Sequence, residues 1–253
     1  MKLRHLNTWI TRLTRTQRLS RGRDDSSFEK SSPPVGGVRL GGLRRVTPIS
    51  QEWGYDRGLP IDRYYIEGFL GRHAADIRGR VLEIGDDTYT RRFGGTRVFQ
   101  CDVLDVAEDN PRATIVADLI CANDIRSNNF DCVILTQTLH LIYDVRAALA
   151  TLYRILKPGG VLLATCPGIT KISHREWGGF WFSAFASFSA RRLFEEVFST
   201  GTVHIESHGN VLAASAFLYG LATEELSQEE LNYVDPDYEV CIAILAVKPG
   251  ATV

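Results

Sequence analysis

The stretch Val81-Leu82-Glu83-Ile84-Gly85-Asp86-Asp87 decides the fold of this chain. Its first four residues are apolar except for Glu83, and Gly85 follows them at once. This pattern predicts a buried β-strand that stops at a glycine turn. In open α/β sheets, ligands bind beyond the carboxyl ends of the strands, beside such a turn. The turn at Gly85 is therefore the first place to look for a bound cofactor.

Strands and helices alternate on both sides of this stretch. Helices are expected over 63–70, after Pro60 and Asp62, and over 145–156, where the run Lys157-Pro158-Gly159-Gly160 is a strong stop signal. Further strands are expected over 96–102, 113–118, 130–136 and 161–166. Such alternation at βαβ spacing predicts a parallel sheet with right-handed crossovers.

The last third of the chain continues with shorter elements. A helix is expected from Ser189, as its N-cap, through Phe198, and another over 210–221. Ser227-Gln228-Glu229-Glu230 has the pattern of a capping box that starts a short helix. Strands are expected over 203–206 and 238–247.

The N-terminal part differs in composition from the rest. No acidic residue precedes Asp24, whereas the whole chain of 253 residues has a net charge of -1. Residues 1–23 have the pattern of a basic amphipathic helix, which indicates a peripheral membrane contact or an acidic partner; a transit peptide or a basic tail without a role are the alternatives. Residues 24–42 have a linker composition, so we expect residues 1–42 to precede a single domain over 43–253.

Composition also argues against several classes of protein. The five cysteines form no C-x-x-C pair, and we expect reduced thiols, a cytoplasmic location and no metal site. No apolar run reaches the ~18–20 residues of a membrane span, and the N-terminus lacks a secretory signal. Nucleic-acid binding is not expected, because the clustered basic residues are confined to the tail.

Several ordered motifs together resemble one large family. They are Glu83-x-Gly85, an acid (Asp102) expected to end the second strand, Asp118-Leu119 after the third, Phe130-Asp131 leading into the fourth, and the Lys157–Gly160 turn. In these motifs the chain resembles the class I S-adenosylmethionine-dependent methyltransferases. The resemblance implies a Rossmann-like fold, with a mostly parallel seven-stranded sheet, an antiparallel last strand and helices on both faces.

A narrower resemblance covers residues 43–248. The first motif of some bacterial methyltransferase-domain proteins, many of them encoded near glycosyltransferases, reads Gly-Asp-x-x-Tyr-Thr-x-x-Phe-Gly, as residues 85–94 do here. The wider family usually has a second glycine where Asp87 stands. Two acids in this loop would repel the pyrophosphate of NAD, whereas S-adenosylmethionine carries a sulfonium and an ammonium. The loop therefore favours S-adenosylmethionine as the cofactor over NAD.

The resemblance also implies roles for particular residues. Glu83, Gly85, Asp86 and Asp87 would shape the pocket for the methionine part, and Asp102 would bind the ribose hydroxyls. A turn acid that only caps a helix is the alternative for Asp102 and Asp118.

The remaining cofactor contacts are expected from four further residues. Asp118 and Leu119 would flank the adenine, and Thr136 and Gln137 would meet the methionine ammonium or the acceptor. Tyr64 would reach the methionine carboxylate from the helix before the first strand, although an aromatic residue on a helix is more often part of the core.

For the acceptor side, the candidate general base is His140, with a packing histidine as the alternative. The lesser candidates are His174, His204 and His208. The aromatic, glycine-rich segment 177–188 is expected to be a lid or acceptor wall, or else a buried element or a homodimer contact. We therefore expect methyl transfer to a small-molecule or saccharide acceptor, as O-methylation; a binding or scaffold protein that has lost this chemistry is the alternative.

Overall fold

The structure of this protein is a computed structural model that describes residues 33–199 and 201–250. The chain divides into two units, Met1–Arg44 and Arg45–Val253. In the described part of the first unit the helical element is a short 3-10 turn, η1 (Gly41–Leu43). The helix predicted over 1–23 lies outside the described residues, as does the first part of the predicted linker.

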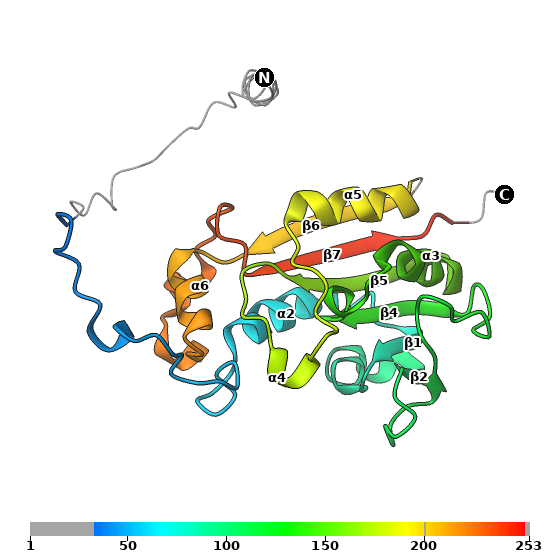
Figure 1. The fold of residues 1–253 in the computed structure, drawn as a ribbon. Coiled ribbons are helices and arrows are strands. Elements are labelled where there is room, and N and C mark those ends of the chain that lie inside the picture. The colour runs from blue at the N-terminus through cyan, green and yellow to red at the C-terminus, as the bar shows by residue number, and fades with distance from the viewer. Residues whose placement is uncertain (1–32, 200, 251–253) are drawn as a thin grey trace, which may run out of the picture. The chain divides into compact units, whose positions relative to one another are not determined.

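A seven-stranded sheet forms the centre of the second unit, with the strand order β3-β2-β1-β4-β5-β7-β6 (Figure 1). Its strands are β1 (Gly79–Ile84), β2 (Val98–Asp105), β3 (Ile115–Val116), β4 (Phe130–Thr136), β5 (Leu156–Pro167), β6 (Thr202–His208) and β7 (Cys241–Val247). The first five strands pair in parallel, and β7 runs antiparallel to both β5 and β6. The predicted class I methyltransferase fold is thus confirmed.

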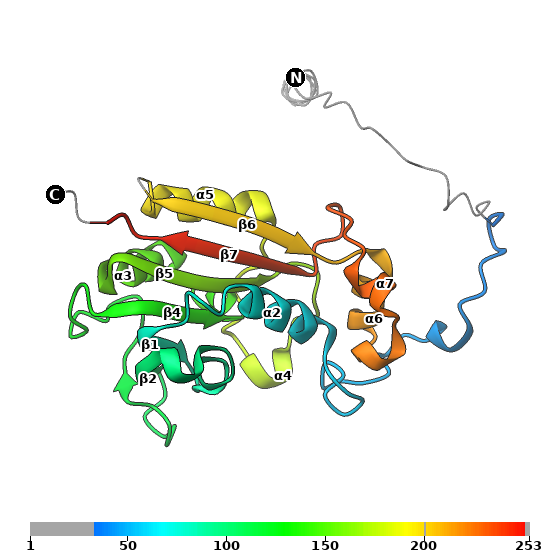
Figure 2. The same cartoon turned by 180° about the vertical axis from the view of Figure 1, so that it is seen from behind.

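Helices cover both faces of this sheet. On one face, α3 (Val145–Ile155) and α5 (Ser187–Val197) pack over a core cluster that includes Leu82, Val133 and Leu162 (Figure 1). On the other, α2 (Ile61–Arg72) and α6 (Val211–Leu218) pack over Val81, Ile134 and Leu163 (Figure 2). Alternate residues of each central strand thus point to opposite faces, and both faces are buried.

Short elements complete the second unit. They are the π-helix η2 (Thr90–Gly94), the 3-10 turns η3 (Gly95–Arg97), η4 (Leu139–Leu141) and η5 (Thr223–Glu225), and the helices α4 (His174–Trp177) and α7 (Gln228–Asn232). Both ribbon views place α4 and α6 at the end of the sheet where β4 and β5 stop (Figures 1 and 2). This is the end where a ligand of an α/β sheet is expected.

The capping signals explain where several helices begin. The predicted capping box is confirmed, because Ser227 Oγ accepts from the Glu230 N–H and Glu230 Oε2 accepts from the Ser227 N–H. Asp144 caps α3 by accepting from the Ala147 N–H, and Asn210 caps α6 by accepting from the N–H groups of residues 212 and 213. Each cap satisfies amide groups that have no partner inside the helix.

Several predicted boundaries were wrong, three of them in the elements named next. Ser189 is not the N-cap of α5, because the helix begins at Ser187 and the Ser189 hydroxyl bonds the Ala186 backbone from within the first turn. The helix after Asn210 ends at Leu218 rather than 221, just before Gly220, whose φ is +70°. Residues 113–118 form a strand only at Ile115–Val116.

The run Lys157–Gly160 ends α3 as predicted, but it does not precede a separate strand. It belongs to β5, which begins at Leu156 and shifts its register against β4 between Phe130 and Cys132. The pairing continues because the Gly159 N–H donates to Lys248 O and Gly160 O accepts from the Lys248 N–H. Lys248, the residue after β7, therefore provides the hydrogen-bond partners for the backbone of this turn.

Three further findings concern the described residues alone. Their five cysteines are free, and Cys132 and Cys166 are buried, as expected. The helices described include none that is long and apolar enough to cross a membrane. In the same part of the chain, no group of three or more His, Cys, Asp or Glu residues is placed to hold a metal ion.

Candidate cofactor and acceptor site

Four parallel strands, β1 to β4, end at the same edge of the sheet, which we call the cofactor edge (residues 85–90, 105–110, 117–119 and 136–137). Gly85 leads the turn after β1, with a φ of +83°. A Cβ built on Gly85 would meet nothing within 4 Å, so the backbone of this turn faces open space. A ligand can therefore approach the main chain here, which a side chain at this position would hinder.

An acid stands beside Gly85, but it is Asp105 and not the predicted Asp102. Asp105 is the last residue of β2, and its Oδ2 accepts from Asn110 Nδ2 at 2.6 Å. The same Nδ2 donates to Gly85 O at 2.7 Å. Asn110 thus ties the carboxylate at the end of β2 to the glycine turn at the end of β1. The apolar pair Val103-Leu104, which continues the strand beyond Asp102, was the sequence signal for this boundary.

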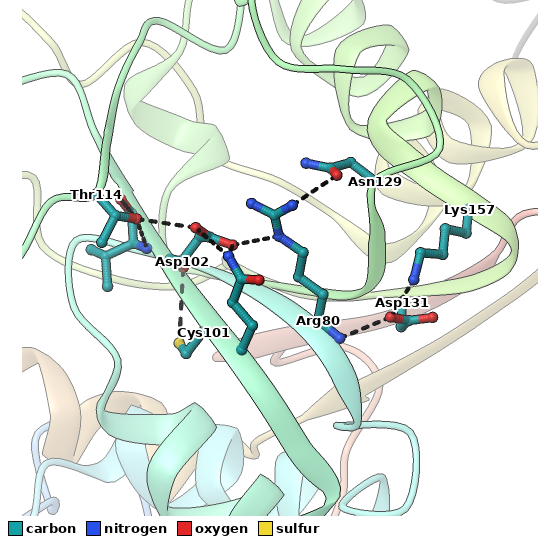
Figure 3. Close-up of polar contacts among 9 residues, drawn as sticks. Arg80, Cys101, Asp102, Thr114, Asn129, Asp131 and Lys157 are labelled. Atoms are coloured by element: carbon teal, nitrogen blue, oxygen red, sulfur yellow. Dashed lines mark hydrogen bonds and ion pairs between the residues drawn. The ribbon is translucent and has the colours of Figure 1, made fainter.

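The prediction that Asp102 ends the second strand was wrong. Asp102 pairs with Leu82 inside the sheet, three residues before the strand ends, and only 7% of its surface is exposed. Figure 3 shows its polar neighbours, which we call the Asp102 network. Arg80 Nε donates to Asp102 Oδ2 at 2.7 Å, and Gln100 and Thr114 donate to the same carboxylate at 3.3–3.5 Å.

Every group of this network has a protein partner. Arg80 Nη1 also donates to Asn129 Oδ1, and its guanidinium lies 5.2 Å from the centre of the Phe130 ring. Next to it, Asp131 accepts from the Arg80 N–H and from Lys157 Nζ (Figure 3). The network therefore ties β1, β2 and β4 together, and it is a structural feature of the sheet.

The acids around the glycine turn mainly hold the turn itself. Glu83 is buried and accepts from the Tyr89 and Thr90 N–H groups, at 3.1 and 2.7 Å, at the start of η2. Burial raises its pKa to about 7, although these hydrogen bonds act in the opposite direction. Asp86 accepts from the Thr88 N–H, and Asp87 pairs with Arg91.

Beyond β3, Asp118 and Leu119 have different surroundings. Asp118 is exposed at the cofactor edge, where its Oδ1 accepts from the Ile120 N–H. Leu119 is 3% exposed and packs into the core beneath α3. Only the backbone of Leu119 is therefore available to a ligand at the edge.

Tyr64 does not face the cofactor edge, contrary to the prediction. Its hydroxyl contacts Gln228 Oε1 at 2.9 Å and Asn232 Oδ1 at 2.7 Å, so the side chain points from α2 toward α7. The preceding residue, Arg63, points the other way, because consecutive helical residues lie on different faces. Its Nε donates to the Tyr55 hydroxyl at 2.8 Å.

The chain turns sharply where β4 ends at Thr136. Gln137 has a φ of +48°, which is uncommon for a residue with a side chain, and its N–H donates to Thr165 O at 2.9 Å. Backbone strain of this kind is concentrated at functional sites. Gln137 belongs both to the cofactor edge and to the cavity described next.

A cavity of about 280 Å³ opens beside Gln137, and we call it the acceptor cavity. Its lining comes from the loop before α2, the start of α2, the turn after β4, the segment after β5, and α6. The lining residues are Glu52, Trp53, Tyr55, Asp62, Arg63, Gln137, His140, Leu141, Pro167, Thr170, Glu176, Trp181, Phe217 and Val240.

His140 lies in the wall of this cavity and is 4% exposed. Its ring centre is 4.3 Å from that of Trp181, and its carbonyl accepts from the N–H groups of Phe182 and Ser183. The Nδ1 atom is buried and has no hydrogen-bond partner. Burial lowers the pKa of His140 to about 4, so the ring is neutral near pH 7.

The aromatic segment after β5 contributes directly to this wall. Trp181 lines the cavity, and Phe182 makes an edge contact with Tyr143, with ring centres 5.4 Å apart. Of the three lesser histidine candidates, His208 stacks on Tyr65 and contacts Glu206, while His174 and His204 are exposed. Those three are absent from the described lining.

Comparison with known proteins identifies the domain. Residues 86–164, less than half of the chain, match a family model described as a methyltransferase domain. The match begins at the turn after Gly85 and ends within β5. Residues 86–164 are thus similar to a methyltransferase domain, and the fold is that of the class I methyltransferases. S-adenosylmethionine is the methyl donor of such a domain.

Solved structures agree with this methyltransferase fold. A methyltransferase dependent on S-adenosylmethionine from Archaeoglobus fulgidus is similar with a TM-score of 0.50 and 14% identity, over 74% of this chain and 94% of that one. A putative sarcosine dimethylglycine methyltransferase from Galdieria sulphuraria gives 0.52 and 14%, over 74% and 86%. A comparison with curated proteins finds none that matches.

One similar structure is not named for methyl transfer. The [4+2]-cyclase SpnF gives a TM-score of 0.51 and 14% identity, over 77% of this chain and 84% of that one. The fold alone therefore does not fix the reaction, which has to be argued from the site.

Proposed function

We propose that this methyltransferase domain methylates a hydroxyl group of a small-molecule or saccharide acceptor held in the acceptor cavity. The observation that carries the proposal is the position of Gln137. Gln137 follows β4 at the sheet edge where the open glycine turn follows β1, and it also lines a cavity whose wall includes a buried neutral histidine. The saccharide part of the proposal rests on the resemblance to proteins encoded near glycosyltransferases.

The residues of the cofactor edge suit S-adenosylmethionine. Asp105 replaces Asp102 as the acid that would bind the ribose hydroxyls, because it ends β2 beside the open turn at Gly85. Asp118 and the backbone of Leu119 would flank the adenine, and the backbone at Thr136 and Gln137 would take the methionine ammonium. When bound, S-adenosylmethionine supplies a methyl group attached to a sulfonium, and the remainder of the cofactor is the leaving group, a neutral thioether.

The part that the protein plays is then alignment and proton removal. The walls of the cavity hold the acceptor, which turns an encounter of two molecules into an oriented reaction. His140 is neutral at pH 7, and in the tautomer with its proton on Nε2 the unpartnered Nδ1 can accept the proton of the acceptor hydroxyl. Burial makes this ring a weaker base than a free imidazole, so the proton has to move as the methyl group is transferred. The burial of His140 also keeps bulk water away from the nitrogen.

The experiment has a binding part and a turnover part. Calorimetry would measure S-adenosylmethionine, S-adenosylhomocysteine and NAD with the wild-type protein and with Asp105→Ala. Transfer of radiolabelled methyl groups would then be followed over a panel of sugars and other hydroxyl compounds. We expect both sulfur compounds to bind and Asp105→Ala to weaken them.

Two results would contradict this function. Binding of NAD alone would exclude the methyl donor. Tight binding of S-adenosylmethionine without turnover on any member of the panel would support the alternative of a binding protein that has lost the chemistry.

A further inference from the structure

Buried polar atoms without a partner gather at the acceptor cavity. Among the described residues, four buried side-chain nitrogen or oxygen atoms lack a hydrogen bond, and two of these four, Asp62 Oδ1 and His140 Nδ1, belong to residues that line the cavity. Buried polar groups are nearly always hydrogen-bonded, because an unmet one costs about 1–3 kcal/mol. A ligand that satisfies both atoms is the simplest explanation.

The charges that line the cavity favour a cation. Among the described lining residues, the carboxylates of Glu52, Asp62 and Glu176 outnumber the guanidinium of Arg63. Glu52 and Glu176 also act on the ammonium of Lys171, so Asp62 is the carboxylate left for a ligand. Arg63 Nε lies 3.9 Å from Asp62 Oδ2 and donates its hydrogen bond to Tyr55 instead. Burial raises the pKa of Asp62, while the charge of Arg63 acts in the opposite direction, and Asp62 Oδ1 has no hydrogen-bond partner. An ammonium group at Oδ1 would favour the ionised form of this buried carboxylate.

The protein already holds one ammonium group against an aromatic residue of the cavity wall. Lys171 Nζ lies 3.7 Å from the centre of the Trp53 ring and donates to Gln51 O. Trp53 is part of the lining, and the carboxylates of Glu52 and Glu176 act on the same ammonium. An aromatic face with nearby carboxylates is an established way to hold an ammonium. The wall is thus chemically suited to bind a second ammonium group at Asp62.

We propose that the acceptor is an amino alcohol, whose ammonium group binds Asp62 Oδ1 while its hydroxyl faces His140 Nδ1. This deepens the proposed function and rests on it. An amine that a carboxylate keeps protonated has no lone pair with which to attack a methyl group. The ammonium is therefore the recognition handle, and the hydroxyl oxygen forms the new bond to carbon while its proton passes to His140. A cavity of about 280 Å³ suits a compound with one ring.

The test uses two sugars that differ in one group. Calorimetry would compare D-glucosamine with D-glucose, each added to the full-length protein saturated with S-adenosylhomocysteine at pH 7. We expect glucosamine to bind at least about tenfold more tightly, as a charge-assisted hydrogen bond predicts. Asp62→Asn should abolish this preference and leave the affinity for S-adenosylhomocysteine unchanged.

A matched variant controls for the loss of a charge. Glu67→Gln removes a carboxylate from the same helix, where it pairs with Arg92 and does not line the cavity. It should keep the preference for glucosamine. Thermal melting of both variants would show that they are folded.

Several outcomes would overturn the proposal. They are equal binding of the two sugars, binding of neither, and a preference that survives in Asp62→Asn. A loss of S-adenosylhomocysteine affinity in Asp62→Asn would instead assign Asp62 to the ammonium of the cofactor. If the wild-type protein does not bind S-adenosylhomocysteine at all, the proposed function fails before this question arises.

Discussion

Two groups of buried polar side chains in this domain are built in opposite ways. In the Asp102 network, the guanidinium of Arg80 donates both to the carboxylate of Asp102 and to the amide oxygen of Asn129. In the acceptor cavity, Asp62 and His140 each present a buried atom that bonds to nothing in the protein. Both groups contain acids at low exposure, so burial by itself does not separate structural groups from functional ones.

Whether a buried polar group has its hydrogen-bond partners separates structural groups from functional ones better than burial does. A buried charge with a full set of partners holds elements together, whereas one with a missing partner costs free energy unless a ligand completes it. Variants in the network should therefore change stability and leave ligand binding intact. Variants in the cavity should do the reverse.

The largest effect is expected for Asp102→Ala. This change leaves the partly buried guanidinium of Arg80 without its carboxylate, and we expect the free energy of unfolding to fall by about 3–4 kcal/mol. Chemical denaturation would measure it, with the exposed Asp109→Ala as a control. Calorimetry at a temperature where the variant is folded should show unchanged binding of S-adenosylhomocysteine. A large loss of binding would return Asp102 to the cofactor site.

The second effect concerns the pH dependence of stability at Glu83. In the folded state its pKa is raised from 4.5 to about 7, so the folded protein holds this proton more tightly than the unfolded chain does. Folding is then favoured by this group below pH 4.5, and the contribution, at most about 3 kcal/mol, is lost as the pH rises toward 7.

Denaturation at a series of pH values would compare wild type with Glu83→Gln. The variant, which is neutral like the protonated carboxyl, should match wild type at low pH and should lack the decline between pH 4.5 and 7, so it should be the more stable protein above pH 7. An identical decline in both proteins would show that other groups cause it.

The third effect is on turnover. His140→Gln removes the proton acceptor, and kcat should fall about 100-fold on any acceptor that is methylated at oxygen. The melting temperature should change little, because His140 Nδ1 has no partner to lose. His204→Gln, an exposed histidine on β6, is the matched control and should keep the wild-type kcat. A normal kcat in His140→Gln would make this residue a packing histidine.

The smallest effect is expected at Asp105, which combines features of both groups: it is hydrogen-bonded within the protein, as Asp102 is, and it is open to a ligand, as the cavity is. Its carboxylate has partners in Asn110 and the Ala107 N–H, but it also stands at the open edge beside Gly85. Asp105→Ala should weaken S-adenosylhomocysteine binding about 30-fold, since a hydrogen bond to a charged group contributes about 2 kcal/mol. Asp109→Ala should bind it normally. Unchanged affinity in Asp105→Ala would remove this residue from the ribose site.

The cofactor edge was largely predictable because it depends on strand ends. The apolar run before Gly85 and the run over 130–136 mark two of these ends, and parallel strands bring their carboxyl ends to one edge. The error at Asp102 arose where a polar residue interrupts a strand. A sequence pattern treats such a residue as an end, whereas Arg80 on the neighbouring strand allows it to stay inside the sheet.

Local patterns in the sequence thus determined the order of the elements, the class of fold and the turn where the cofactor is expected, because periodicity, caps and glycines act over a few residues. Only the tertiary structure decided which polar groups are left without partners. Asp62, Gln137 and Trp181 lie far apart in the chain and line one cavity, while Tyr64, two residues after Asp62, turns away toward α7. Whether a polar side chain is hydrogen-bonded depends on neighbours that folding brings together from distant parts of the chain. Those neighbours cannot be read from local sequence patterns.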